Sequence, residues 1–358
     1  MRILMPVFTV ADWGGLHENA LHSAEVLRKA GHEITFVCRD GRIAEAAKSL
    51  GLDVIVVDWQ DWQSEADLLR ETREYDLIFT QLQEARKFAL EVKGSSDVPV
   101  IAQIQGFWSD AAHTWRDKVD AWIAVAPALT NLLAGFSKVE PWRISEIPNA
   151  VDTIQFLALT KNFEEKTAGG EARISLVSRL DADKRAQRDA AIDIVSHFSR
   201  LQPELNWRLD VYGDGPEKEL FELELADAFR GSQNVSYDLK GWVDAEDVPQ
   251  ILANSFASVA AGRGALQSIV AGTPCFASGK FGNQGLQHGL ALRIGLWSNF
   301  GDYPAGNTPA FNLESQVKSL LDPNSYVAIQ SHGQAIVAVE RDVDFADQKL
   351  VELVNDFS

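Results

Sequence analysis

Short apolar runs alternate with segments whose apolar residues recur at helical spacing along most of the chain. Such runs are typical of strands buried on both faces of a parallel sheet. In the first part of the chain we predict strands at 2–10, 33–38, 54–57, 77–80, 98–104, 119–125 and 144–147. Helices are predicted between them at 18–30, 43–50, 64–74, 84–93 and 127–135. This alternation predicts an α/β fold with a doubly wound parallel sheet.

Residues 152–171 are polar and aperiodic, and the alternation then restarts. Strands are predicted at 173–177, 209–212, 235–239, 257–260 and 275–278, and helices at 186–199, 217–229, 246–254, 265–271, 311–321, 326–339 and 345–356. We therefore predict two Rossmann-like domains, 1–152 and 172–342, joined by a linker at 153–171, with a C-terminal helix at about 343–358 that packs back on the first. Two such sheets facing one another leave a cleft at the carboxyl ends of their strands.

The charge balance narrows the choice of partners. The 358 residues are 46% hydrophobic and 23% charged, an ordinary globular composition. With 33 basic and 51 acidic residues, the formal net charge is −18. This charge argues against nucleic acid as a partner, and it disfavours electrostatic anchoring to anionic lipid while leaving a local peripheral membrane contact open.

The two cysteines, Cys38 and Cys275, fall in apolar runs of different halves, so a disulfide between them is not expected. Two unpaired thiols fit a reducing cytoplasm. No apolar run approaches the 18 residues of a membrane span, and we interpret the apolar start of the chain as a buried strand rather than a signal peptide.

The stretch from Ser258 to Ala277 predicts a strand, a glycine turn, a short helix ended by Gly272 and a second strand. Gly262 and Gly264 bracket Arg263 in the turn. A glycine turn that leads into a helix leaves backbone N–H groups free to bind a phosphate. The alternative is a tight loop that only joins two core elements.

Arg179 follows the first strand of the second half, and Lys184 comes five residues later. A strand end that carries both cations suits a diphosphate. The alternative is a solvated basic turn. The intervening Asp181 and Asp183 have the spacing of a metal-binding pair, but we interpret them as a solvated acidic turn and expect no metal site.

Several other residues invite a functional interpretation. Trp242 and Val243 end a predicted strand in a position to meet a flat base. Phe107 and Trp108 follow a first-domain strand and could stack on sugar faces, although core packing or loop anchoring is the commoner role of such rings. His17, Glu18 and His22 approach a zinc-protease motif, but the second histidine is one residue too far along the helix.

The order of these motifs resembles family four of the retaining glycosyltransferases (glycosyl transferases group one), whose two Rossmann-like domains form the GT-B fold. The segments that carry the resemblance are WGG at 13–15, AGHEITFV at 30–37, IPNAVDTIQF at 147–156, VSRLDADK at 177–184, YGDGPEKELFELELA at 212–226 and LQSIVAGTP at 266–274. They cover nearly the whole chain in the family's order.

The resemblance implies a UDP- or GDP-linked sugar as donor, held mainly by the second domain, and a glycan or other hydroxyl-bearing acceptor on the first. Arg179 and Lys184 would neutralise the diphosphate leaving group, with Trp242 and Val243 at the base. Gly14 and Gly15 would bring the opening loop against the donor phosphates. No other cofactor is implied.

Three positions depart from the family. Gln267 stands where the family has a glutamate that binds ribose hydroxyls, and Val259 stands where it has a second glutamate. Gln105 replaces a histidine near the acceptor, and Arg263 with Gly264 is expected to serve the phosphates. The sequence therefore predicts a retaining glycosyltransferase, or alternatively a catalytically impaired nucleotide-sugar-binding or accessory protein of the same fold. A dehydrogenase fits poorly, because no GxGxxG follows the first strand.

Overall fold

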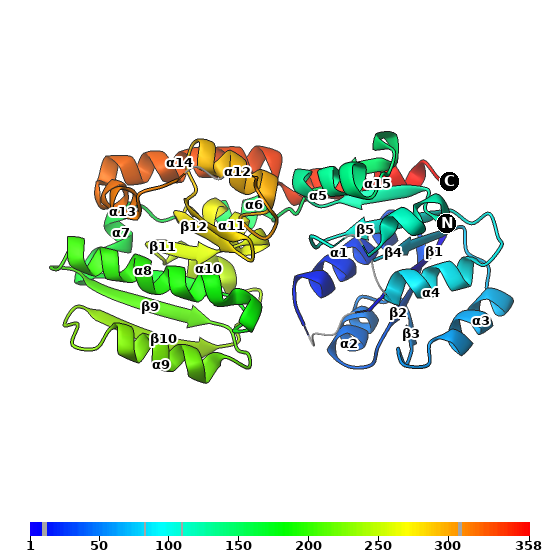
Figure 1. The fold of residues 1–358 in the computed structure, drawn as a ribbon, viewed down its shortest axis with the longest axis horizontal. Helices are drawn as coiled ribbons and strands as arrows, with labels where there is room; N and C mark the ends of the chain where they lie inside the picture. Colours follow the sequence, from blue (N-terminus) through cyan, green and yellow to red (C-terminus); the bar gives the residue numbers. More distant parts are fainter. Residues whose placement is uncertain (9–12, 82–83, 109, 307–309) are drawn as a thin grey trace. The chain divides into compact units, whose positions relative to one another are not determined.

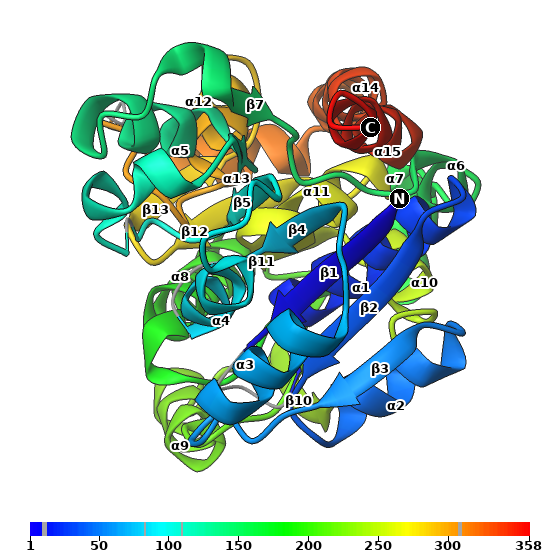
Figure 2. The same ribbon diagram turned by 90° about the vertical axis from the view of Figure 1, so that its right-hand side faces the viewer.

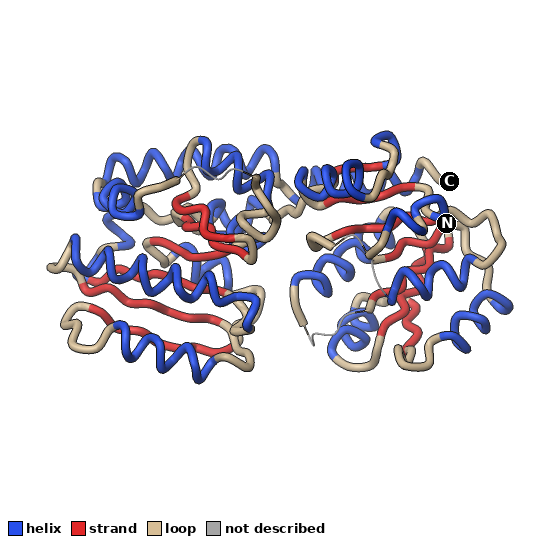
Figure 3. The backbone as a smooth tube through the Cα atoms, in the orientation of Figure 1, coloured by secondary structure: helices blue, strands red, loops and turns tan. Residues whose placement is uncertain are grey.

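A computed structural model describes residues 1–8, 13–81, 84–108, 110–306 and 310–358, which form two compact units. The first unit contains Met1–Pro148 and Asp344–Ser358, and the second contains Asn149–Val343. The elements of each unit are drawn in Figure 1, and Figure 3 shows helices enclosing strands in both.

The first unit is built on a seven-stranded parallel sheet in the order β3-β2-β1-β4-β5-β6-β7, part of which is visible in Figure 2. Its strands are β1 (Arg2–Val7), β2 (Glu33–Cys38), β3 (Asp53–Val56), β4 (Leu77–Thr80), β5 (Val100–Ile104), β6 (Ala121–Ala124) and β7 (Ile144–Glu146). Its helices are α1 (Gly15–Lys29), α2 (Arg42–Ser49), α3 (Gln63–Thr72), α4 (Glu84–Lys93), α5 (Pro127–Asn131) and α15 (Val343–Asn355). The strand order reverses between β1 and β4, which makes their carboxyl ends the switch point of this sheet.

The second unit repeats this plan with a six-stranded sheet in the order β10-β9-β8-β11-β12-β13, in which only β13 is antiparallel to its neighbour. Its strands are β8 (Glu171–Val177), β9 (Asn206–Tyr212), β10 (Val235–Gly241), β11 (Ala257–Ala260), β12 (Cys275–Gly279) and β13 (Gly282–Leu286). Its helices are α6 (Thr153–Leu157), α7 (Phe163–Lys166), α8 (Arg185–Leu201), α9 (Lys218–Ala228), α10 (Val248–Ala253), α11 (Gly262–Val270), α12 (Leu290–Ser298), α13 (Leu313–Leu321) and α14 (Pro323–Glu340). The switch point lies between β8 and β11.

Two apolar clusters cover the faces of the second sheet. One packs Ile194 and Phe198 of α8 and Phe221 of α9 against the strands. The other gathers buried residues of α10, α11, α12 and α14. The sheet is thus the middle layer of three, and α11 is fixed with its first residue at the carboxyl end of β11.

The structure differs from the sequence prediction in two places, at residues 153–171 and at residues 282–298. Residues 153–171 are not an extended linker: they form α6 and α7, and they belong to the second unit. The strand β13 and the helix α12 were not predicted. The terminal helix α15 joins the first unit, where His22 Nε2 lies 2.7 Å from Asp347 Oδ1.

Cys38 and Cys275 are both buried and free, and burial raises the pKa of each thiol to about 12. Both thiols are therefore chemically inert at neutral pH. In the described part of the chain, none of the helices combines the length and apolar character needed to cross a membrane.

Candidate functional site

The predicted glycine turn lies at the switch point of the second sheet. Gly262 begins α11 with φ +55°, a conformation that favours glycine, and Gly272 follows the helix with φ +73°. Gly264 lies close to β8, because a Cβ at this position would be 4.0 Å from the carbonyl oxygen of Val177. The N-terminus of α11 and the end of β8 are therefore adjacent, so residues of both could contact one phosphate.

Lys184 is connected to this helix N-terminus through Asp302, and Arg179 is connected to Lys184 through Asp183. The side chains of Arg179 and Lys184 are 35% and 18% exposed, so neither extends into bulk water. Lys184 Nζ is 3.7 Å from Asp302 Oδ1, and Asp302 Oδ2 lies 2.8 Å from where a Cβ on Gly262 would be. Asp302 thus connects the ammonium group of Lys184 to the first residue of α11.

Asp181 and Asp183 are the unexpected members of the site. The sequence suggested a solvated acidic turn, but Asp181 forms a short ion pair with Arg179. Asp183 Oδ2 is 3.7 Å from Arg179 Nη2 and 3.8 Å from Lys184 Nζ. The two cations of the predicted diphosphate site are therefore already paired with carboxylates.

The segment that carries Asp302 is held in a strained backbone conformation. Asn299 and Phe300 both have positive φ, at +52° and +57°. The carbonyl oxygen of Asn299 accepts a hydrogen bond of 3.1 Å from the backbone N–H of Gly262, and its side chain accepts one of 3.2 Å from Asn149 Nδ2. Such strain persists where the surroundings impose it, often at functional sites. Asn149 belongs to the IPNAVD motif, so this motif helps to hold the 299–302 segment in place.

Burial raises the pKa of the Asp302 carboxyl, and the nearby Lys184 ammonium partly offsets this effect. Asp302 and Asn299 were not predicted from the sequence, because they follow residues 282–298, in which no strand or helix was predicted. The turn-forming composition of Asn299, Gly301 and Asp302 was the available signal.

The helix α11 is also anchored at its other end. Lys166 Nζ donates to the carbonyl oxygen of Gly272 at 2.7 Å and to Thr273 Oγ1 at 2.9 Å. Gln330 Nε2 donates to the same carbonyl at 2.6 Å. A side-chain donor at a helix C-terminus satisfies carbonyl groups that have no partner within the helix. These contacts fix the axis of α11, and with it the direction of its N-terminal N–H groups.

The remaining predicted donor residues are distributed around the second sheet. Arg263 is exposed, and Gln267 is partly buried one turn further along α11. Trp242 follows β10 and is 59% exposed. Val259, by contrast, is fully buried within β11.

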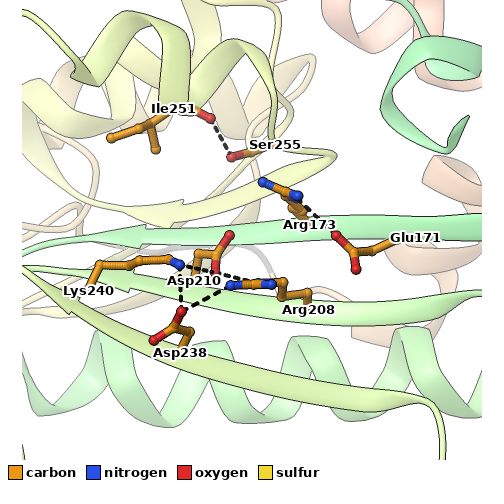
Figure 4. Close-up of polar contacts among 8 residues, drawn as sticks. All are labelled: Glu171, Arg173, Arg208, Asp210, Asp238, Lys240, Ile251 and Ser255. Carbon is orange, nitrogen blue, oxygen red and sulfur yellow. Dashed lines mark hydrogen bonds and ion pairs between the residues drawn. The ribbon is translucent and has the colours of Figure 1, made fainter. Parts of the chain in front are cut away.

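Val243 lines a cavity of about 300 Å³ between α10 and strands β8 and β9. Arg173, Tyr212, Gln250 and Asn254 are among its other lining residues. On this face of the sheet, Asp210 is almost fully buried, and its Oδ1 lies 2.8 Å from Arg208 Nε and 3.9 Å from Lys240 Nζ. Figure 4 shows these three side chains together with Asp238.

The first unit brings polar side chains together at its own switch point. Gln105 follows β5, and its Nε2 donates to Asn19 Oδ1 of α1 at 2.6 Å. Gln105 Nε2 also lies 3.5 Å from the Oε1 of Gln81, which follows β4. Gly14 and Gly15 begin α1, and a Cβ on either would meet nothing within 4 Å, so both face open space.

The aromatic residues divide into packed and exposed rings. Trp115 is 6% exposed, with its ring centroid 4.9 Å from that of Trp122, so core packing explains it. Phe107 and Trp108, the predicted acceptor residues, are 36% and 60% exposed. His17 is buried and stacks on Trp13, with ring centroids 5.5 Å apart. Across the described residues, three or more His, Cys, Asp or Glu side chains do not gather as metal ligands would.

Two Rossmann-like units, each built on a sheet with its own switch point, define a protein of the GT-B class. The sequence model of Glycosyltransferase Family 4 matches residues 13–155, which lie in the N-terminal part of the chain. This match confirms the resemblance found in the sequence and supports a sugar-transfer function. A search of curated proteins found no significant match.

Solved structures with the same fold span nearly the whole chain. A glycosyltransferase from Rickettsia africae superposes with a TM-score of 0.73 at 13% identity, covering 99% of this chain and 98% of that one. A mutant of TarM from S. aureus, solved in complex with Fondaparinux, alpha-GlcNAc-glycerol and UDP, gives 0.64 at 12% identity, with 99% of each chain covered. UDP-GlcNAc 2-epimerase from Neisseria meningitidis, bound to UDP-GlcNAc, gives 0.58 at 11% identity, with 99% and 100% covered. Likeness at such identity shows the GT-B fold alone.

Proposed function

We propose that the protein is a retaining glycosyltransferase that moves a sugar from a UDP- or GDP-linked donor to a glycan or another hydroxyl-bearing acceptor. The observation that carries this proposal is a connected group of side chains at one switch point: Arg179 and Lys184 share Asp183, and Asp302 connects Lys184 to the N-terminus of α11. A guanidinium, an ammonium and a helix N-terminus together suit a diphosphate.

These groups would act on the leaving group. As the glycosidic bond breaks, negative charge grows on the diphosphate, and Arg179 and Lys184 would stabilise it. Retention would follow from attack on the same face of an oxocarbenium-like centre, with a leaving-group phosphate oxygen accepting the acceptor's proton. No resident cofactor is needed for this step.

The other predicted residues would bind rather than react. Trp242 and Val243 would meet the base, and Arg263, Gly264 and Gln267 the phosphates and donor hydroxyls. In the first domain, Gly14 and Gly15 would admit the donor phosphates. We assign the acceptor to Gln105, Phe107 and Trp108. We expect the protein to act in the cytoplasm, where free thiols stay reduced.

A second function, that of a catalytically impaired binding or accessory protein, is favoured by one observation. Val259 is apolar and fully buried where the family carries a glutamate. Gln267 can accept a hydrogen bond through its amide oxygen, but it supplies no charge. A protein of this kind would bind a nucleotide sugar without turning it over.

Thermal shift with UDP, GDP and ADP tests nucleotide binding, and a panel of nucleotide sugars tests transfer. A nucleotide at a hundred times its Kd stabilises the folded state by about 2.7 kcal/mol. We expect Arg179→Ala and Lys184→Ala each to weaken the shift, whereas Arg185→Ala, whose side chain is 65% exposed, serves as the matched control.

The outcomes separate the two functions. Transfer or hydrolysis of a nucleotide sugar supports the enzyme, and binding without either supports the accessory protein. If the wild type, Arg179→Ala and Lys184→Ala bind nucleotide with equal affinity, neither Arg179 nor Lys184 is part of the nucleotide site.

A further inference from the structure

Asp183 is the carboxylate that both cations of the site share. Its Oδ2 lies 3.7 Å from Arg179 Nη2 and 3.8 Å from Lys184 Nζ. One negative charge therefore lies between the two positive groups that we assign to the diphosphate. Any anion that contacts both cations must compete with this carboxylate.

Asp183 is the most exposed of the three carboxylates, at 42% against 27% for Asp181 and 25% for Asp302. Both of its ion-pair distances exceed the 2.7–3.2 Å of an N–H···O hydrogen bond. Its side chain is 42% exposed, and exposed ion pairs of this length contribute little to stability. It can therefore turn into solvent at small cost.

Asp181 and Asp302 are held in place. The Oδ1 of Asp181 lies 3.0 Å from where a Cβ on Gly215 would be, so Asp181 packs against the turn after β9. Asp302 lies in the strained 299–302 segment beside Gly262, and its side chain is 25% exposed. Both side chains are therefore packed against backbone turns, whereas Asp183 is open to solvent.

We propose that Asp183 is an exchangeable internal counter-ion of the nucleotide site, which leaves Arg179 and Lys184 when a phosphate of the ligand replaces it. This inference rests on the proposed function. In the free protein Asp183 neutralises the two cations, and on binding the ligand takes over its contacts. Asp183 thereby lowers the affinity of the site for the diphosphate and favours its release.

The proposal predicts that removing the charge of Asp183 strengthens nucleotide binding, whereas damage to the site would weaken it. Asp183→Asn removes the competing charge and keeps the size of the side chain, so nucleoside diphosphate should bind more tightly. From the strength of exposed ion pairs we expect the Kd to fall about three- to tenfold. Asp183→Glu keeps the charge and should bind within about twofold of the wild type.

Asp189→Asn is the matched control. Asp189 is 57% exposed on α8, and its ion pair is with Arg185, at 3.8 Å. This variant makes the same change in net charge without changing a partner of Arg179 or Lys184, so its Kd should equal that of the wild type. A tighter Kd in Asp189→Asn would trace the effect to net charge and overturn the proposal.

The experiment is calorimetric titration of the full chain with whichever of UDP, GDP and ADP binds the wild type most tightly. In a Lys184→Ala background the effect of Asp183→Asn should shrink, because one of the two contested cations is gone. If Asp183→Asn binds no more tightly than Asp189→Asn, the counter-ion role is wrong while the proposed function stands. If none of the three nucleotides binds the wild type, both the proposed function and this inference fail.

Discussion

Replacing Lys166 with methionine should change how the stability of the protein depends on pH. The Lys166 side chain is almost fully buried in the second unit, and burial lowers its pKa from 10.5 to about 7. Its Nζ donates hydrogen bonds to Gly272 and Thr273, which are as many as a neutral amine can donate. The folded protein therefore releases a proton near neutral pH that the unfolded chain retains up to about pH 10.

The sign and size follow from proton linkage. Between pH 7 and pH 10 the unfolded state binds more protons, so the free energy of unfolding rises with pH, by at most about 1.4 kcal/mol per pH unit. Lys166 is half-protonated in the folded state near pH 7, and integration from pH 7 to pH 9 leaves a gain of about 2 kcal/mol. Lys166→Met has no group to titrate and loses this contribution.

Urea unfolding of both proteins at pH 7, 8 and 9, followed by circular dichroism, measures the effect. The difference in unfolding free energy, wild type minus Lys166→Met, should rise by about 2 kcal/mol over this range. Lys318→Met is the control, because its side chain is 61% exposed and burial cannot favour its neutral form. A difference that stays constant with pH would show that Lys166 remains a charged helix cap in the folded protein.

Three further substitutions test the site and its support. Gly262→Ala should destabilise the fold by about 1–3 kcal/mol and weaken nucleotide binding, because φ is +55° and the new Cβ would lie 2.8 Å from Asp302 Oδ2. Thermal unfolding measures the loss of stability, and calorimetric titration measures the loss of nucleotide affinity. Glu217→Gln should cost about 3–5 kcal/mol, seen as a lower Tm, because it leaves the buried Arg188 without its ion-pair partner. Gln267→Glu should tighten nucleotide-sugar binding or raise turnover by restoring a charged acceptor, and weaker binding would show that the amide itself is required.

The parallel strands and their helices could be predicted because each carries its own signal. A strand such as β1, buried on both faces, requires a continuous apolar run, and a helix such as α8 requires one apolar face. The segment 280–290 carries neither signal: β13 reads Gly-Asn-Gln-Gly-Leu, and its pairing with β12 determines its conformation. The helices α6 and α7 are too short for periodicity, and they depend on the Asp152 and Asn162 caps.

The site shows the same division between local and distant information. Arg179 and Lys184 could be predicted from the strand end, because they follow the last residue of β8 by only two and seven positions. Asp302 could not, because 118 positions in the chain separate it from Lys184, and the fold alone brings the two side chains to 3.7 Å. The sequence also shows which residues are present but not what they contact. From the sequence alone, Asp183 belongs to a solvated acidic turn, and only its distances to Arg179 and Lys184 show that it pairs with both cations.

These partners change what the two cations can be expected to do. Two unpaired cations would bind many anions, whereas two cations paired with Asp181, Asp183 and Asp302 bind only an anion that offers more than the carboxylates it displaces. A diphosphate does so, because its charge reaches both cations and the positive end of the α11 dipole together. A monocarboxylate offers no gain over Asp183. The paired state of the site therefore favours a diphosphate ligand more strongly than the presence of Arg179 and Lys184 alone.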